Sequence, residues 1–166
     1  MRHLLPPRRP PHLRAAQPGD GAPAWAVVRR AVHEGAAGAY TPEQRRAWAP
    51  GPEAPPGWEA GLLAGHTVLA ERRRRMTGFM TLAGDGHLDY AYVLPEAMGT
   101  GLSDRLLDAI EAQAHALGLV VLTTEASHLA RRFLVRRGWR VAARQDVIRN
   151  GVALTNFRMH YRLRRD

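Results

Sequence analysis

Two glycines, Gly99 and Gly101, have the spacing that most directly suggests chemistry. They stand between a predicted strand, 87–94, and a predicted helix, 100–117. Because glycine has no side chain, backbone N–H groups at such a turn can approach a ligand closely. The start of a helix leaves its first N–H groups without partners and carries the positive end of the helix dipole. The pattern therefore predicts an anion site suited to a pyrophosphate.

This turn lacks the features of the two common phosphate-binding motifs. A Walker A loop would continue with Gly-Lys-Ser/Thr, and no such residues follow. The dinucleotide fingerprint would have a third glycine where Asp104 stands. The histidines show no metal-ligand spacing, so we expect no metal site.

Hydrophobic periodicity places the glycine turn inside a βαβ unit. The helix carries one apolar stripe and stops at Gly118. The run 119–124 is apolar without alternation, which favours a fully buried strand. A crossover of this kind is right-handed and makes strands 87–94 and 119–124 a parallel pair. On strand 87–94, alternation puts four residues on one face, namely His87, Asp89, Ala91 and Val93.

The elements around this unit also have local signals. Asp20 is placed to cap a helix, and Thr41 with Gln44 forms a capping box at the start of another. Ser127 is placed to cap an amphipathic helix that ends at Gly138. Asn150-Gly151 is a strong two-residue hairpin signal. The remaining predicted strands are 12–16, 66–70, 76–82, 140–149 and 152–163.

Composition excludes several kinds of chemistry. The chain has 166 residues with 24 basic residues against 15 acidic ones, a formal charge of +9, and every basic residue is arginine. The absence of cysteine and lysine excludes disulfides, thiolate metal sites and catalysis by either side chain. No run approaches the ~20 apolar residues of a membrane helix, so we expect a cytoplasmic protein. Residues 1–12 predict a disordered Pro/Arg-rich tail, followed by a single domain over 13–166.

Two blocks of this sequence resemble the GNAT superfamily of N-acetyltransferases. The acetyl-CoA signature of that family stands here as Glu96-Ala97-Met98-Gly99-Thr100-Gly101. The second block stands as Ala130, Phe133-Leu134 and Gly138-Trp139. The resemblance implies an α/β (α+β) fold, with a mixed, mostly antiparallel twisted sheet of about six or seven strands and helices on both faces. It implies transfer of an acetyl group from acetyl-CoA, as co-substrate, directly to an amine of a small molecule or protein.

The resemblance also implies where acetyl-CoA binds. The pantetheine arm would pair with the backbone at Tyr92, Val93 and Leu94. Ser127 would fix its end, and Arg131 with Arg132 would contact phosphates and offset the carboxylate of Glu96. The pyrophosphate would rest on consecutive backbone amides, those of Met98, Gly99, Thr100, Gly101 and Leu102.

The resemblance identifies the residues that transfer protons less completely than those that bind acetyl-CoA. His87 takes the position of the usual glutamate base and Asp89 lies two residues on, so these two are the candidate catalytic residues. An imidazole beside a carboxylate is a reasonable base near neutral pH. The usual tyrosine acid is replaced by Leu134, which cannot donate a proton. The substitutes are Tyr40, Tyr90, Tyr92, water, or an unassisted thiolate.

Two other functions are compatible with parts of the sequence. Glu96 and Leu134 would suit a GNAT-like module that binds acyl-CoA without catalysis. The charge of +9 would suit a nucleic-acid-binding domain, which ranks last because no nucleic-acid-binding motif is present. The predictions include no membrane partner, and a homodimer formed through the terminal strand is left open. The sequence does not identify the acceptor.

Overall fold

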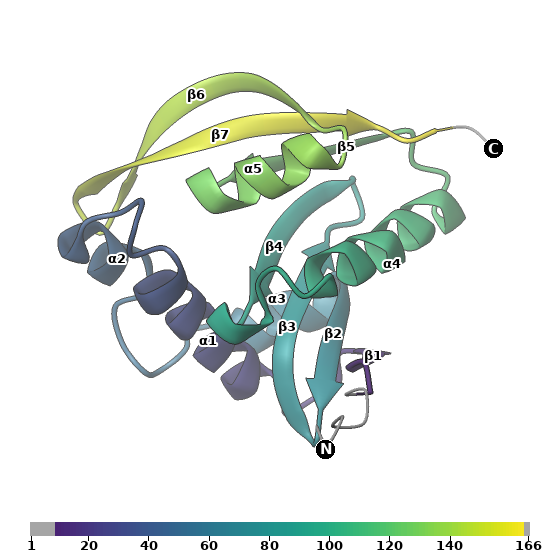
Figure 1. Ribbon diagram of the computed structural model, residues 1–166, viewed down its shortest axis with the longest axis horizontal. Coiled ribbons are helices and arrows are strands. Elements are labelled where there is room, and N and C mark those ends of the chain that lie inside the picture. Colours follow the sequence, from purple (N-terminus) through teal and green to yellow (C-terminus); the bar gives the residue numbers. More distant parts are fainter. Residues whose placement is uncertain (1–8, 165–166) are drawn as a thin grey trace, which may run out of the picture.

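The computed structural model describes residues 9–164 of the chain, as an α/β fold (Figure 1). The predicted tail at 1–12 lies largely outside these residues, and His12 already belongs to the first strand. Among the described residues, no helix is long and apolar enough to cross a membrane. The elements in chain order are β1 (His12–Ala15), α1 (Gly21–Arg30), a wider helical turn η1 (Ala31–Gly35), α2 (Pro42–Trp48), α3 (Trp58–Ala64), β2 (His66–Arg72), β3 (Arg75–Leu82), β4 (His87–Val93), a short turn η2 (Pro95–Ala97), α4 (Leu102–Ala116), β5 (Val121–Ala126), α5 (His128–Arg136), β6 (Arg140–Arg149) and β7 (Val152–Arg162).

One seven-stranded sheet has the order β1-β2-β3-β4-β5-β7-β6. Every neighbouring pair is antiparallel except β4 and β5. This confirms the predicted mixed, mostly antiparallel sheet with one parallel pair. β4 and β5 pair only through His87 with Thr123 and Leu88 with Thr124, which are at the beginning of β4 and in the middle of β5. They diverge beyond these residues, which leaves an opening in the middle of the sheet (Figure 1).

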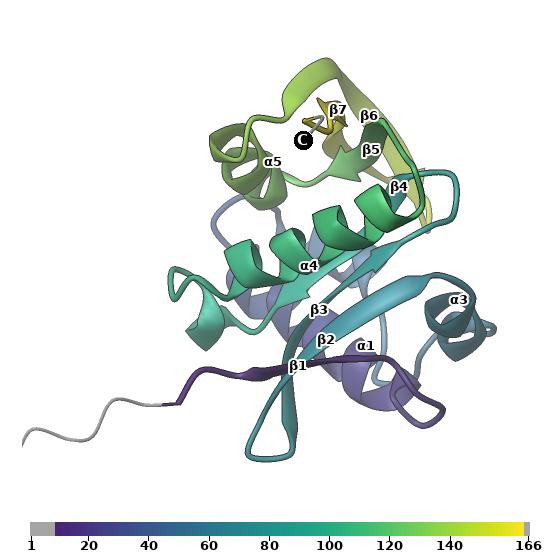
Figure 2. The same cartoon turned by 90° about the vertical axis from the view of Figure 1, so that its right-hand side faces the viewer.

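Helices cover both faces of the sheet, as predicted (Figure 2). On one face, α4 buries Leu106, Leu107 and Ile110 against strands β2 to β4. On the other face, α1 packs Trp25 and Val28 into a second cluster. Truncation of a fully buried leucine such as Leu106 typically costs ~2–5 kcal/mol. The two cores hold the divergent strands from opposite sides.

Several local predictions are confirmed by hydrogen bonds. Thr41 and Gln44 form the capping box of α2, and the Ser127 hydroxyl accepts the Ala130 N–H at 3.2 Å. Asn150 and Gly151 have positive φ in the predicted hairpin turn. Asp20 is the N-cap residue of α1, as predicted, but its side chain makes no capping hydrogen bond. Its carboxylate accepts from Arg14 at 2.8 and 2.9 Å and from the N–H of Gln17 instead.

Two expectations about strands are corrected. The strand predicted at 119–124 is β5, which begins at Val121, because the N–H of Leu119 bonds back to α4 at the Ala114 carbonyl. β5 also alternates, with Val121 and Glu125 exposed, since no helix covers that side. On β4, a bulge shifts the register with β3 around Asp89. The bulge turns His87 to the face opposite Ala91 and Val93, so the predicted shared face is wrong.

Candidate active site

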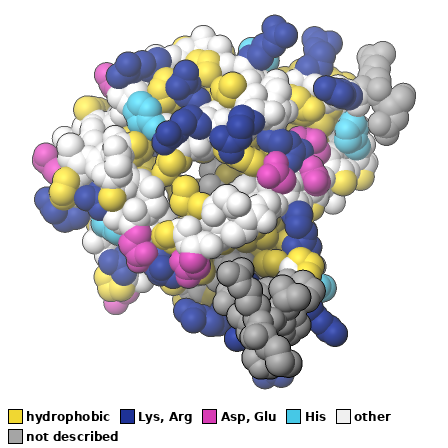
Figure 3. Space-filling model, in the orientation of Figure 1, with side chains coloured by type: hydrophobic (Ala, Val, Ile, Leu, Met, Phe, Trp, Pro, Cys, Tyr) yellow, Lys and Arg dark blue, Asp and Glu magenta, His cyan; other side chains and the backbone are white. Residues whose placement is uncertain are grey.

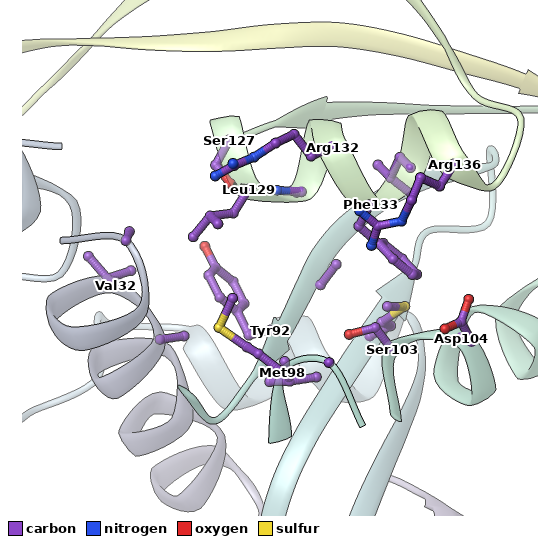
Figure 4. Close-up of a pocket in the computed structure, with 18 of the residues that line it drawn as sticks. Val32, Tyr92, Met98, Ser103, Asp104, Ser127, Leu129, Arg132, Phe133 and Arg136 are labelled. Carbon is purple, nitrogen blue, oxygen red and sulfur yellow. Dashed lines mark hydrogen bonds between the residues drawn. The ribbon is translucent and has the colours of Figure 1, made fainter. Parts of the chain in front are cut away.

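The opening between β4 and β5 holds a cleft of about 370 Å³, called here the loop cleft (Figures 3 and 4). This volume falls within the range of small-molecule sites. The cleft runs from the loop before α4, past the middle of β4, to the first turns of α5. Figure 3 shows it as a hollow with basic side chains gathered along its α5 side. The residues that line it include Trp48, Ala91, Tyr92, Val93, Met98, Gly99, Gly101, Ser103, Asp104, Ser127, Arg132, Phe133, Leu134 and Arg136.

The loop end of the cleft offers unpaired backbone donors. Gly99 and Gly101 have φ of +71° and +85°, which favours glycine. Within the described residues, five amides have no protein acceptor: Gly99, Gly101 and the first three residues of α4. The predicted set is partly corrected, because the N–H groups of Met98 and Thr100 bond within the loop to Pro95 and Ala97. Unpaired amides at the positive end of a helix dipole are the features of an anion site.

Arginines from α5 face this loop across the cleft. Arg132 and Arg136 line the cleft; the side chain of Arg136 points toward Ser103 of α4, whereas that of Arg132 lies beside Ser127 (Figure 4). The predicted residue Arg131 is not among the lining residues. Its guanidinium lies 4.7 Å from the centroid of the Phe157 ring. The arginines of α5 that line the cleft are therefore Arg132 and Arg136.

The carboxylate of Glu96 is neutralised from α1. Arg30 donates to both of its oxygens, at 2.9 and 3.0 Å, and this contact lowers the pKa of Glu96 below its usual range. The expectation that Arg131 or Arg132 would offset Glu96 is therefore wrong. Arg30 belongs to α1, which packs against the opposite face of the sheet from α4. The order of the elements in the sequence does not predict this contact.

The middle of β4 presents an unpaired strand edge to the cleft. Beyond Leu88, no residue of β4 pairs with β5. Tyr92 and Val93 line the cleft, whereas Leu94 is buried in the α1 core and its N–H bonds to the Thr77 carbonyl at 2.8 Å. An extended ligand chain could therefore pair with this edge as an added strand.

A second pocket of about 510 Å³, called here the aromatic pocket, lies on the α1 side of β4. Its walls combine aromatic rings with a few charged and amide side chains. The rings are those of Trp25, Tyr40, Trp48, Trp58, Tyr90 and Tyr92. The other functional groups are those of His87, Asp89, Glu125, Arg149 and Asn156. The prediction from sequence missed Glu125, Arg149 and Asn156 because no motif marks them.

The loop cleft and the aromatic pocket share three lining residues, Trp48, Tyr92 and Ser127. The indole N–H of Trp48 donates to the Tyr92 hydroxyl at 3.1 Å. Burial raises the pKa of Tyr92 to about 12. The phenol is therefore neutral near pH 7, and its own proton remains free to donate where the two spaces join.

The two predicted catalytic residues, His87 and Asp89, both line the aromatic pocket rather than the loop cleft. Nδ1 of His87 lies 2.9 Å from the Thr123 hydroxyl, which orients the ring. Burial raises the pKa of Asp89, while nearby His87 opposes the shift. A carboxylate with a raised pKa is a stronger base than one with the ordinary pKa, and the Asp89 side chain remains exposed to solvent. Among residues 9–164, no cluster of three potential metal ligands is present.

Comparisons with known proteins agree with this geometry. A family model described as an acetyltransferase (GNAT) domain matches residues 37–161. YafP of Escherichia coli K12, an uncharacterized N-acetyltransferase, is 30% identical over 151 residues, which cover 90% of this chain and 95% of YafP. A GCN5-related N-acetyltransferase from Rhodopseudomonas palustris has a TM-score of 0.88 and 33% identity, covering 94% of this chain and 98% of its own. The acetyl-CoA complex of yncA from Salmonella typhimurium has the same fold, with a TM-score of 0.65 and 20% identity, covering 95% of this chain and 96% of its own.

Proposed function

Because this chain belongs to the GNAT acetyltransferase family, we propose that it transfers an acetyl group from acetyl-CoA directly to an amine. The junction of two spaces at Tyr92 carries this proposal. The loop cleft would take acetyl-CoA, and the aromatic pocket would take the amine of a small molecule or protein. Both reactants would then be present together, which lowers the entropic part of the barrier.

The residues of the loop cleft fit acetyl-CoA in two ways. The five unpaired amides at Gly99 and Gly101 to Asp104, with Arg132 and Arg136, suit a pyrophosphate. The unpaired edge of β4 suits the amide groups of a pantetheine arm. When bound, acetyl-CoA supplies a thioester whose carbonyl carbon is the electrophile and whose sulfur is the leaving group.

The residues of the aromatic pocket would prepare the amine. We assign proton removal to Asp89 and His87, directly or through water, since both line this pocket. An amine is nucleophilic only after it loses its proton, so a base with a raised pKa suits this role. Nearby Glu125 adds a second carboxylate that attracts a protonated amine into the pocket.

We assign proton donation at the junction to Tyr92. Leu134 lines the cleft at the position of the usual tyrosine, and its buried side chain offers no donor. Tyr40 is otherwise engaged, because its hydroxyl donates to the Thr155 carbonyl at 2.8 Å and accepts the N–H of His128. The Tyr92 hydroxyl has no such acceptor among the described residues. It can therefore hydrogen-bond to charge that develops on the leaving sulfur.

The test is amine-dependent release of CoA from acetyl-CoA, measured with a thiol reagent. The chain has no cysteine, so the reagent reports only on CoA. The panel should contain arylalkylamines, polyamines, amino acids and short peptides with a free N-terminus. We expect release with at least one of these classes. Calorimetric binding of CoA without release for any amine would contradict catalysis and favour the acyl-CoA-binding module.

A further inference from the structure

A third cavity, of about 630 Å³, lies on the opposite side of the 98–102 loop from the loop cleft. It is bounded by the segment before β1, the β2–β3 turn, the loop after β4 and the start of α4, which Figure 2 shows near one another. It shares no lining residue with the loop cleft. Five arginines line it, and we call it the arginine cavity: Arg9, Arg72, Arg73, Arg75 and Arg105.

The positive charge of this cavity has little compensation within the protein. Among residues 9–164, none of the five arginines forms an ion pair. Glu96 is the only carboxylate that the described residues contribute to the lining. Both of its oxygens are held by Arg30, and it interacts with Arg75 at longer range. Arg105 donates to the Pro11 carbonyl at 2.8 Å, which ties the N-terminal segment to α4. Several like charges around one concave space repel each other, and an anion bound among them relieves this repulsion.

The β2–β3 turn contains residues that are poorly suited to its backbone. Arg73 and Arg74 have φ of +50° and +62°. Two-residue turns with positive φ at both positions prefer Asn-Gly, because a Cβ is unfavourable there. The backbone of the turn is therefore strained, and its four consecutive arginines, Arg72 to Arg75, repel one another. Such a conflict between local preference and structure is expected where the side chains serve a ligand.

We propose that the arginine cavity binds a compact chain of phosphates, such as a triphosphate group, separately from acetyl-CoA. Guanidinium groups donate paired hydrogen bonds to phosphate oxygens, and five of them are enough to neutralise the negative charge of a triphosphate. Within the 96–105 segment, each residue lines either the arginine cavity or the loop cleft, and none lines both. Binding of phosphates in the arginine cavity does not require acetyl transfer, so this proposal does not depend on the proposed function.

The experiment titrates inorganic tripolyphosphate into the full chain by calorimetry, with and without saturating CoA. We expect one equivalent to bind when CoA saturates the loop cleft, with an affinity that falls steeply as salt rises. A second equivalent is expected only without CoA, when the amides of the loop cleft are free. Absence of binding would overturn the proposal. Loss of all tripolyphosphate binding on addition of CoA would also overturn it, since the phosphates would then occupy only the CoA site. The titration without CoA remains informative if acetyl transfer is not found.

Two neighbouring arginines provide matched variants. Arg73 lines the cavity and Arg74 does not, although both are exposed and have positive φ. Asparagine tolerates this conformation, so R73N and R74N should both fold, which thermal unfolding will check. We expect R73N to weaken tripolyphosphate binding about tenfold and R74N to change it less than about twofold. Equal losses would indicate general charge attraction and overturn the site.

Discussion

The loop cleft and the aromatic pocket meet at Tyr92 but are built from different groups. The anion site of the cleft consists mainly of backbone amides at Gly99, Gly101 and the start of α4. The aromatic pocket consists of side chains from α1, α2, α3 and strands β4 to β7. The first site depends on backbone conformation within a few consecutive residues. The second depends on which side chains the fold brings together.

This difference predicts different responses to substitution. A change that alters the backbone of the loop should remove binding of the cofactor as a whole. A change in the aromatic pocket should leave cofactor binding intact and alter the rate or the choice of amine. Binding of CoA and turnover are therefore the two readouts that separate the regions.

The largest effect is expected for Gly99→Glu. A glutamate there would strain the backbone at φ +71° and place a carboxylate against the pyrophosphate. We expect CoA affinity to fall roughly 100-fold or more in calorimetry. Gly118→Glu is the matched control, because Gly118 has the same φ at the other end of α4 and open space around it. Equal CoA affinity of the two variants would contradict the assignment of the loop.

The next effect concerns the base. Asp89→Asn should lower kcat about 100-fold, since general-base catalysis contributes that much or more, while CoA affinity stays unchanged. In the wild type, kcat should increase with pH as Asp89 loses its proton. Because the pKa of Asp89 is raised, this increase should occur at a higher pH than for an ordinary aspartate. A variant with unchanged kcat would remove Asp89 from the mechanism and leave His87 as the base.

The same substitution should affect stability in the opposite direction. The pKa of Asp89 is higher in the folded chain than in the unfolded chain, so the folded state holds the proton more strongly. Stability therefore falls as pH rises from the unfolded pKa through the folded pKa, and the loss is complete above it. At pH 7, Asp89→Asn should melt at a slightly higher temperature than the wild type, and at pH 3 the difference should disappear.

A smaller effect is expected at the junction. Tyr92→Phe removes the free hydroxyl and should lower kcat about tenfold, with little change in KM for acetyl-CoA. Tyr40→Phe is the comparison, because its hydroxyl bonds to Thr155 and His128. We expect Tyr40→Phe to cost about 1 kcal/mol of stability with less effect on kcat. The reverse pattern would identify Tyr40 as the donor.

The smallest effect separates neighbouring arginines of α5. Arg132→Gln should weaken CoA binding by about threefold to tenfold, because one charged contact is lost. Arg131→Gln should leave CoA binding unchanged and reduce stability by about 0.5–1 kcal/mol, through loss of the contact with Phe157. Calorimetry and thermal unfolding of both variants check this. Weaker CoA binding by Arg131→Gln alone would support the prediction from sequence that Arg131 contacts the phosphates of CoA.

The same comparison explains how far the sequence was informative. The glycine turn, the βαβ unit and the caps at Thr41 and Ser127 were predictable because each depends on neighbouring residues. The partner of Glu96 was not predictable, since Arg30 lies 66 positions away in the sequence. The bulge at Asp89 was also missed, and it reverses the face on which His87 lies. The aromatic pocket gathers single residues from many elements, so no local pattern marks it.

The central claim is that both substrates are bound together at Tyr92 and react without an acetylated enzyme. The most direct test is two-substrate initial-rate kinetics, with acetyl-CoA and an accepted amine varied together and CoA release measured. Direct transfer predicts reciprocal plots that intersect, and an enzyme mass that is unchanged after incubation with acetyl-CoA alone. Parallel plots with an acetylated enzyme would contradict the claim.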